Sequence, residues 1–268
     1  MNGSGDQVHG RQTALVTGAS SGIGLELARL FAHDGYRLVL VAKNRARLEE
    51  VAGEFAHAFG AEVMVLAQDL AQSDSPDKIY AEMQARSIAV EVLVNNAGFG
   101  TYGFLAETDL KAELQQLQVN IVALTHLTKL FVRGMLDRGH GRILNVASTA
   151  AFQPGPLMAV YYASKAYVAS FSEAIANELQ GTGVTVTCLC PGPTRTEFHT
   201  RAGMERSRLV MGKMMDAAAV ARIGYRGLMA GKTLVIPGLR NQLLALGAKL
   251  GPRGLVTKAA REFQESVP

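Results

Sequence analysis

The sequence is poor in the residues that form disulfides, metal sites and aromatic platforms. Its 268 residues include no tryptophan, 6% aromatic residues and two cysteines. Cys188 and Cys190 lie two positions apart in an apolar run, so on a strand both thiols face one side and do not readily bond to each other. We interpret them as small buried thiols in a reducing compartment. None of the six histidines has metal-ligand spacing, so no metal is expected.

A secretory signal and a long apolar run are also lacking. Residues 1–10 are polar and rich in glycine, which predicts a flexible lead-in rather than a signal peptide. The longest uncharged run, residues 143–164, contains two prolines and several polar groups and does not resemble a membrane span. We therefore expect a cytoplasmic protein.

The charge of the chain is unevenly placed. The net charge is +4, and residues 240–268 alone contain five basic and two acidic residues. The sequence pI of about 9.1 would permit nucleic-acid binding. However, there is no tryptophan and no known binding motif, so no nucleic-acid partner is expected.

Short apolar runs alternate with helical patterns along the chain. Strands are predicted at Thr13–Thr17, Arg37–Val41, Glu62–Ala67, Val90–Val94, Arg142–Val146, Val184–Leu189 and Thr233–Ile236. Helices are predicted at about Gly22–His33, Arg45–Phe59, Ser75–Arg86, Leu110–Arg133 and Met158–Gln180. This alternation predicts an α/β fold, a Rossmann-like doubly wound sheet of seven parallel strands with helices on both faces. We expect one domain over residues 11–237 and a helical extension over residues 238–268.

A glycine-rich turn follows the first predicted strand and opens the first predicted helix. The glycines of Thr17-Gly-Ala-Ser-Ser-Gly-Ile-Gly24 allow a tight turn, close approach of the backbone to a phosphate, and close helix–strand packing. The free N–H groups and the helix dipole then favour a pyrophosphate. The candidate cofactor contacts in this turn are Gly18, Ser20, Ser21, Gly22, Ile23 and Gly24.

The end of the second predicted strand distinguishes between the two nicotinamide cofactors. An NAD site usually places an acid there for the ribose 2′-hydroxyl, but this chain has Ala42, Lys43, Asn44 and Arg45. A carboxylate would repel the extra phosphate of NADP, whereas Lys43 and Arg45 would attract it. NADP(H) is therefore favoured over NAD(H), with Lys43 the better candidate. The alternative is that both are ordinary solvated residues at the start of a helix.

Polar residues also end the third and fourth predicted strands, at the edge where the cofactor would bind. Asp69 is placed to accept from an adenine amino group, and residues 96–98 to line a ribose. Asn95 is more simply explained as a tie between strands. The candidate contacts here are Asp69, Leu70, Asn96, Ala97 and Gly98.

Three further residues form a candidate proton-transfer set. Tyr161 and Lys165 are four positions apart, so both leave one face of a helix. A nearby ammonium stabilises tyrosinate and lowers a phenol pKa, which would make Tyr161 a general acid or base. Ser148, just beyond a strand, can donate to a substrate oxygen. Tyr162 lacks such a partner, because Ala166 stands four residues beyond it.

Together these motifs resemble the short-chain dehydrogenase/reductase family, in its compact single-domain, NADP-preferring branch. The resemblance covers about residues 11–237 and includes the glycine turn, the Asn-Asn-Ala-Gly run at 95–98 and the Ser, Tyr and Lys set. It also includes Asn120 and the run Pro191-Gly-Pro-Thr-Arg-Thr196.

The resemblance implies a role for each matching residue. Tyr161 would be the acid or base, Lys165 would hold the nicotinamide ribose, and Asn120 would support a water of a proton relay. Residues of about 197–216 would form a variable substrate lid, and the helices near 110–133 and 158–180 would pair subunits into a homodimer or homotetramer. The residues near the nicotinamide would be Pro191, Gly192, Thr194 and Thr196.

The implied function is NADPH-dependent reduction of a ketone, or oxidation of a secondary alcohol, with a 3-oxoacyl or hydroxysteroid-like substrate. The basic lid suggests an anionic substrate. The alternative is a non-catalytic NADP-binding sensor. The tail over residues 238–268 resembles those of a bacterial reductase subgroup also related to hydroxysteroid dehydrogenases. A subunit contact is favoured for it over contact with a membrane.

Overall fold

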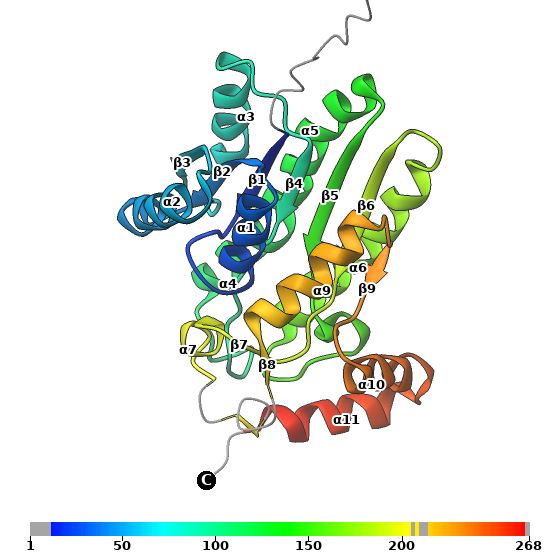
Figure 1. The fold of residues 1–268 in the computed structure, drawn as a ribbon. Coiled ribbons are helices and arrows are strands. Elements are labelled where there is room, and N and C mark those ends of the chain that lie inside the picture. Colours follow the sequence, from blue (N-terminus) through cyan, green and yellow to red (C-terminus); the bar gives the residue numbers. More distant parts are fainter. Residues whose placement is uncertain (1–11, 205–206, 209–213, 266–268) are drawn as a thin grey trace, which may run out of the picture.

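The computed structural model describes residues 12–204, 207–208 and 214–265, so the predicted lead-in lies outside the described residues. Seven parallel strands form one sheet in the order β3-β2-β1-β4-β5-β6-β9 (Figure 1). This confirms the predicted fold. The strands are β1 (Thr13–Thr17), β2 (Arg37–Ala42), β3 (Val63–Ala67), β4 (Val92–Asn95), β5 (Gly141–Val146), β6 (Val184–Leu189) and β9 (Leu234–Val235).

Helices cover both faces of the sheet because successive strand residues point to opposite sides. Ala14 and Val16 of β1 pack in one core, and Leu15 packs in the other. The first core includes side chains of α1 (Gly22–His33), α2 (Arg45–Phe59) and α9 (Ala217–Met229). The second includes side chains of α3 (Ser75–Ala85), α5 (Leu124–Arg138) and α6 (Ala159–Glu178).

The long helix predicted over 110–133 is continuous but not uniform. It consists of α4 (Leu110–Leu117), a π-helical segment η1 (Gln118–Ala123) and α5, and it ends at Arg138. By length and composition alone, Leu110–Arg138 is the one run within the described ranges that is long and apolar enough to cross a membrane. Because this run contains charged residues, it was not among the uncharged runs of the sequence. Because Leu127 and Met135 are fully buried in the core, the run is explained as a core helix.

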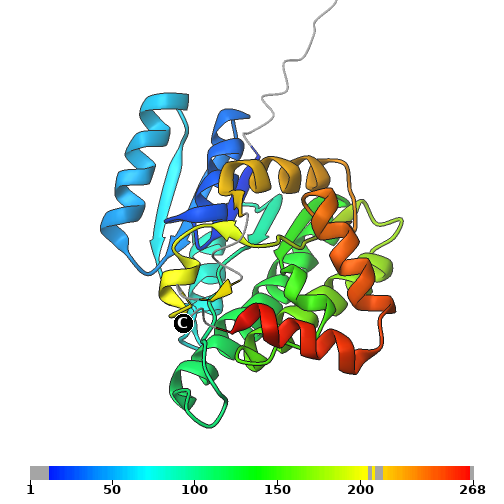
Figure 2. The ribbon, with the colours of Figure 1, turned by 90° about the horizontal axis from the view of Figure 1, so that it is seen from below.

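The segments after β6 lie across the carboxyl end of the sheet. A two-stranded sheet joins β7 (Thr194–Arg195) to β8 (Met215–Asp216), and α7 (Phe198–Arg201) lies between them. Two further helices, α10 (Leu239–Leu250) and α11 (Arg253–Gln264), end the described chain. Figure 1 shows α10 and α11 below the carboxyl ends of the strands, and Figure 2 shows them from that side. Ligands bind at this end of the strands in folds of this type.

Candidate active site

One cavity of about 1280 Å³ lies at the carboxyl end of the sheet. It is lined by the glycine turn, the ends of β2 to β5, the start of α6 and the segments after β6. The predicted residues that it brings together are Gly18, Ser20, Ser21, Gly22, Ile23, Lys43, Asn44, Asp69, Leu70, Asn96, Ala97, Gly98, Ser148, Tyr161, Lys165, Pro191, Gly192, Thr194 and Thr196. Three predicted residues do not line it: Gly24, Arg45 and Asn120.

The glycine turn has the geometry of an anion cradle. Gly18 has a φ of +66°, and a Cβ there would come within 2.8 Å of the Asn96 amide. Gly24 serves packing rather than contact, because a Cβ there would lie 2.4 Å from the Gly18 carbonyl oxygen. Helix α1 begins at Gly22, and the side chain of Ser21 does not cap it. The first N–H groups of α1 are therefore available to a phosphate, so the turn fits a dinucleotide.

The end of β2 presents one basic residue to the cavity rather than two. The Lys43 side chain is exposed, and its Nζ lies 4.0 Å from Oδ2 of Asp69. Arg45 points elsewhere and pairs with Glu49 at 3.6 Å, so its predicted role in cofactor binding is not supported by its position. Asn44 caps α2, with its Oδ1 accepting from the Arg47 N–H.

The asparagines at the end of β4 act mainly as ties. As predicted, Asn95 joins neighbouring elements, because its Nδ2 donates to Asn145 on β5 and to Thr128 on α5. Asn96 donates from Nδ2 to the carbonyl oxygens of Thr17 and Gly18. Asn96 therefore holds the glycine turn in place while lining the cavity.

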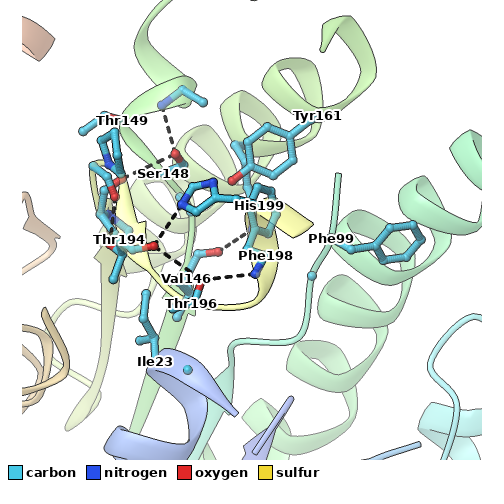
Figure 3. A pocket seen from close by; sticks show the side chains of 18 of the residues that line it. Ile23, Phe99, Val146, Ser148, Thr149, Tyr161, Thr194, Thr196, Phe198 and His199 are labelled. Carbon is cyan, nitrogen blue, oxygen red and sulfur yellow. Dashed lines mark hydrogen bonds between the residues drawn. The ribbon is translucent and has the colours of Figure 1, made fainter. Parts of the chain in front are cut away.

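Ser148 and Tyr161 meet in this cavity from two different elements (Figure 3). Ser148 begins η2 (Thr149–Phe152) directly after β5, and its Oγ accepts from the Ala150 N–H and donates to the Pro191 carbonyl. Tyr161 lies in the first turn of α6. Desolvation by the surrounding protein raises the pKa of its phenol, and hydrogen bonding with Ser148 partly opposes this shift.

Lys165 is buried beside Tyr161, but its effect on the phenol differs from the prediction. Its Nζ donates to the Val146 carbonyl at 2.8 Å and lies 5.8 Å from the centroid of the Tyr161 ring. Burial lowers the pKa of Lys165 to about 8. The predicted lowering of the Tyr161 pKa by this ammonium was therefore wrong for the protein alone, because desolvation dominates at both groups.

Asn120 lies behind the site rather than in it. It belongs to the π-helical segment, and its side chain exchanges two hydrogen bonds with the backbone of Phe99 and donates to Ser164. A Cβ on Gly98 would lie 3.0 Å from Asn120 Oδ1 and 3.2 Å from Lys165 Nζ. The side chains of Asn120 and Lys165 therefore both approach Gly98. Asn120 lies in a π-helical segment, and such turns are frequent at functional sites.

The predicted lid is described only in part, since residues 205–206 and 209–213 lie outside the described ranges. Phe198 packs on the Tyr161 ring with 5.2 Å between centroids. His199, which no sequence motif indicated, lines the same cavity and is 8% exposed. Its Nε2 donates to the Thr194 carbonyl, and burial lowers its pKa, so the ring is neutral near pH 7.

The C-terminal helices form a wall of the cavity, which the sequence did not predict. Gln264 is 1% exposed, and its Nε2 donates to the hydroxyl group of Tyr162. The Gln264 carbonyl accepts from Tyr102 at 2.6 Å. Tyr162, the rejected candidate for the acid, thereby anchors the tail. Spacing within the tail gave no signal for this contact, because its partner is 102 residues away.

The cysteines and the potential metal ligands can be located in the described part of the chain. Cys188 and Cys190 are buried free thiols with sulfur atoms 3.6 Å apart, which confirms that they share one face. No group of three or more His, Cys, Asp or Glu side chains within the described ranges is arranged to hold a metal ion.

Comparison with known proteins identifies the family. The family model described as short chain dehydrogenase matches residues 12–206, so this chain belongs to the short-chain dehydrogenase/reductase family of oxidoreductases. It is 38% identical over 187 residues to a putative ketoacyl reductase of Streptomyces coelicolor, covering 69% of this chain and 71% of that one.

A second relative and a solved structure extend the likeness. The chain is 36% identical over 183 residues to the very-long-chain 3-oxoacyl-CoA reductase of Anas platyrhynchos, covering 66% of this chain but only 58% of that protein. It is 30% identical to a short-chain dehydrogenase from Sphingobium yanoikuyae in complex with NADPH. The TM-score is 0.80, with 88% of this chain and 92% of that one covered.

Proposed function

We propose that this chain is an NADPH-dependent reductase of a bulky, largely apolar ketone, which in reverse oxidises the matching secondary alcohol. The observation that carries the proposal is the position of Ser148, Tyr161 and Lys165 in one cavity with the uncapped N-terminus of α1. A dinucleotide on that helix end and a carbonyl beside Tyr161 would occupy the same cavity.

The side chains of the chain account for the proton and the orientation of the substrate. Bound NADPH would supply the hydride to the carbonyl carbon. Ser148 would donate a hydrogen bond to the substrate oxygen, and the Tyr161 hydroxyl would pass its proton to that oxygen as negative charge develops there. The raised pKa of Tyr161 keeps it protonated and ready for reduction. Lys165 would bind the ribose and place positive charge beside the tyrosinate that forms.

The preference for NADPH rests on charge at the end of β2. Lys43 lines the cavity with its side chain exposed, and Ala42 stands where an acid would repel a 2′-phosphate. The carboxylate of Asp69, 4.0 Å from Lys43 Nζ, partly offsets this charge. The discrimination between NADPH and NADH therefore depends on Lys43 alone. The NADPH complex of the Sphingobium yanoikuyae protein supports the same assignment.

The substrate class rests on the opposite wall of the cavity. That wall is largely apolar, with Met158, Phe198, Val256 and Phe263 among its residues. The cations Arg201, Arg208 and Arg240 also line the cavity. An acyl chain fits the apolar wall, and a phosphate-bearing thioester would meet the arginines. The 3-oxoacyl-CoA and ketoacyl substrates in the names of two relatives agree with this chemistry. Hydroxysteroid-like ketones are the neutral class to compare.

A carbonyl panel tests the proposal. Oxidation of NADPH and NADH is followed with 3-oxoacyl thioesters and with bulky neutral ketones. Tyr161→Phe should lower turnover by about 10²–10⁴-fold and leave NADPH binding intact, because only the proton donor is lost. Tyr167→Phe is the matched control, since Tyr167 is an exposed tyrosine on the same helix.

Three results would count against the proposal or refine it. Turnover that survives Tyr161→Phe would show that another group supplies the proton. Better turnover of neutral ketones than of thioesters would remove the anionic preference. NADPH binding without turnover of any carbonyl would favour an NADP-binding sensor.

A further inference from the structure

Helix α10 exposes a continuous row of leucines. Leu239, Leu243, Leu246 and Leu250 are spaced four, three and four residues apart, so they share one face of the helix. Their exposed fractions are 71, 61, 53 and 78%, whereas Ala245 on the other side is buried. Single exposed leucines are ordinary, but a contiguous row of four marks an interaction surface. We call these four residues the leucine stripe.

Positive charge surrounds the leucine stripe. Arg240 and Lys249 lie on α10, and Arg253, Lys258 and Arg261 lie on α11. Among the described residues, only Arg261 of these five has an ion pair, with Glu265 at 3.2 Å. The other four cations are exposed and have no carboxylate partner in that part of the chain, and Lys249 lies 4.9 Å from the centroid of the Phe152 ring. An apolar row flanked by cations without carboxylate partners is the pattern of a helix that lies at the surface of an anionic bilayer.

The cavity opens beside the leucine stripe. Leu239, Leu243, Leu244 and Phe263 all line the cavity, yet each is more than half exposed. They therefore form its rim, and two of them belong to the stripe itself. Both views of the fold show α10 and α11 next to each other at the carboxyl end of the sheet (Figures 1 and 2). Two residues of the leucine stripe, Leu239 and Leu243, therefore lie at the rim of the cavity.

We propose that the leucine stripe docks on an anionic lipid surface, with the mouth of the cavity toward the lipid. Charge decides against a second copy of the chain as the occupant. A two-fold contact through the stripe would bring Arg240 and Lys249 against their own copies and repel. Anionic headgroups neutralise the same cations while the leucines enter the acyl boundary.

Docking has a consequence for the supply of substrate. An apolar ketone dissolved in the bilayer reaches the cavity rim without crossing water. This consequence rests on the proposed reductase function, whereas the docking itself does not. Lipid binding and turnover are therefore measured separately, and one can fail without the other.

Vesicle flotation of the full chain tests the proposal. Vesicles of phosphatidylcholine alone are compared with vesicles containing roughly one third phosphatidylglycerol, at low and high salt. We expect binding to the anionic vesicles that weakens with salt. Leu246→Gln with Leu250→Gln should lower the partition coefficient at least about tenfold, since both side chains lie outside the cavity lining and enter the lipid. Arg253→Glu with Lys258→Glu should remove the preference for the anionic lipid.

Matched controls separate docking from general damage. Leu136→Gln with Met229→Gln changes two other exposed apolar residues, in the last turns of α5 and α9, and should leave binding unchanged. Arg222→Glu with Lys232→Glu is the control for charge. It changes two exposed cations outside α10 and α11 and should also leave vesicle binding unchanged. Turnover of a water-soluble ketone should be equal in all these variants. If the leucine variant does not fold, the charge variant on α11 still tests the same surface.

Two outcomes would overturn the proposal. One is the absence of vesicle binding at low salt, or binding that the leucine and charge variants leave unchanged. The other is a concentration-dependent dimer of the wild type that the leucine variant dissociates, without any vesicle binding. That second outcome would assign the stripe to a second copy of the chain.

Discussion

Gln264 of α11 donates a hydrogen bond to the hydroxyl group of Tyr162, the neighbour of the proposed proton donor. The two residues are 102 positions apart, and both are buried. The tail is therefore built into the wall of the substrate cavity. The side chain of Gln264 thus couples the position of α11 to the first turn of α6.

Replacing Gln264 by Leu should loosen α11 without touching the acid. The Tyr162 hydroxyl loses one of its two hydrogen-bond partners, since Gln153 remains, and this costs about 0.5–1.5 kcal/mol. We expect a lower Tm and a raised KM for bulky apolar ketones, with kcat for a small ketone little changed. Glu262→Gln, an exposed change on the same helix, is the control. A fall in kcat for every substrate at constant KM would show instead that Tyr162 takes part in the chemistry.

Lys165 is expected to lower the free energy of unfolding, although it belongs to the proposed catalytic set. Burial lowers its pKa to about 8 from an ordinary 10.5, so below pH 8 the folded state carries a poorly solvated ammonium. The unfolded chain binds more protons between these values, so stability rises with pH through that window. Lys165→Met should stabilise the protein at pH 7 by at most about 3 kcal/mol and abolish this rise. Denaturant unfolding at pH 7 and pH 10 measures both effects.

The same pKa predicts the pH dependence of reduction. As pH rises through about 8, Lys165 loses the charge that would stabilise the tyrosinate of Tyr161, so kcat for reduction should fall. An arginine at position 165 retains its charge at every accessible pH. In Lys165→Arg the fall of kcat near pH 8 should therefore disappear, whatever the absolute kcat of the variant. A limb near pH 8 that persists in Lys165→Arg would assign the titration to another group.

The sequence predicted the parts of the site that local pattern determines. Buried parallel strands are mostly apolar, and the glycines of the turn are needed by backbone geometry, so both can be read from the chain. Tyr161 was separated from Tyr162 by the lysine four residues on, and the structure places Tyr161 with Ser148 and Lys165 in one cavity.

What the sequence missed depends on contacts between distant residues. Gln264 gains its place from Tyr162, which is 102 positions away. His199 bonds to the nearby Thr194 carbonyl, and it was missed because its burial depends on how the whole fold surrounds it. Desolvation, which sets the pKa values of Tyr161 and Lys165, depends on how the whole fold surrounds them. Helix α9 was also missed, although the sequence contained its signal. Val220, Ala221 and Leu228 follow a helical period, and Asp216 caps the helix.

Lys43 and Arg45 are expected to differ in their effect on the cofactor. Lys43→Ala should raise the KM for NADPH about tenfold and leave that for NADH unchanged, because one charge-assisted contact with the 2′-phosphate is lost. Arg45→Ala should change neither, since Arg45 pairs with Glu49 outside the cavity. Equal losses in both variants would place the phosphate over the start of α2 rather than at Lys43.

Gly24 should tolerate no side chain, although its backbone is ordinary helix. A Cβ there would lie 2.4 Å from the Gly18 carbonyl oxygen and 2.3 Å from the Asn96 amide, so the whole turn would have to shift. We expect Gly24→Ala to cost about 1–3 kcal/mol of stability and to weaken NADPH binding. Gly53→Ala is the matched control, because Gly53 lies in α2 with nothing within 4 Å of the added Cβ and should gain up to about 1 kcal/mol. Thermal unfolding and cofactor titration of both variants decide whether Gly24 acts through packing. Normal stability with lost binding would mean that Gly24 contacts the phosphate directly.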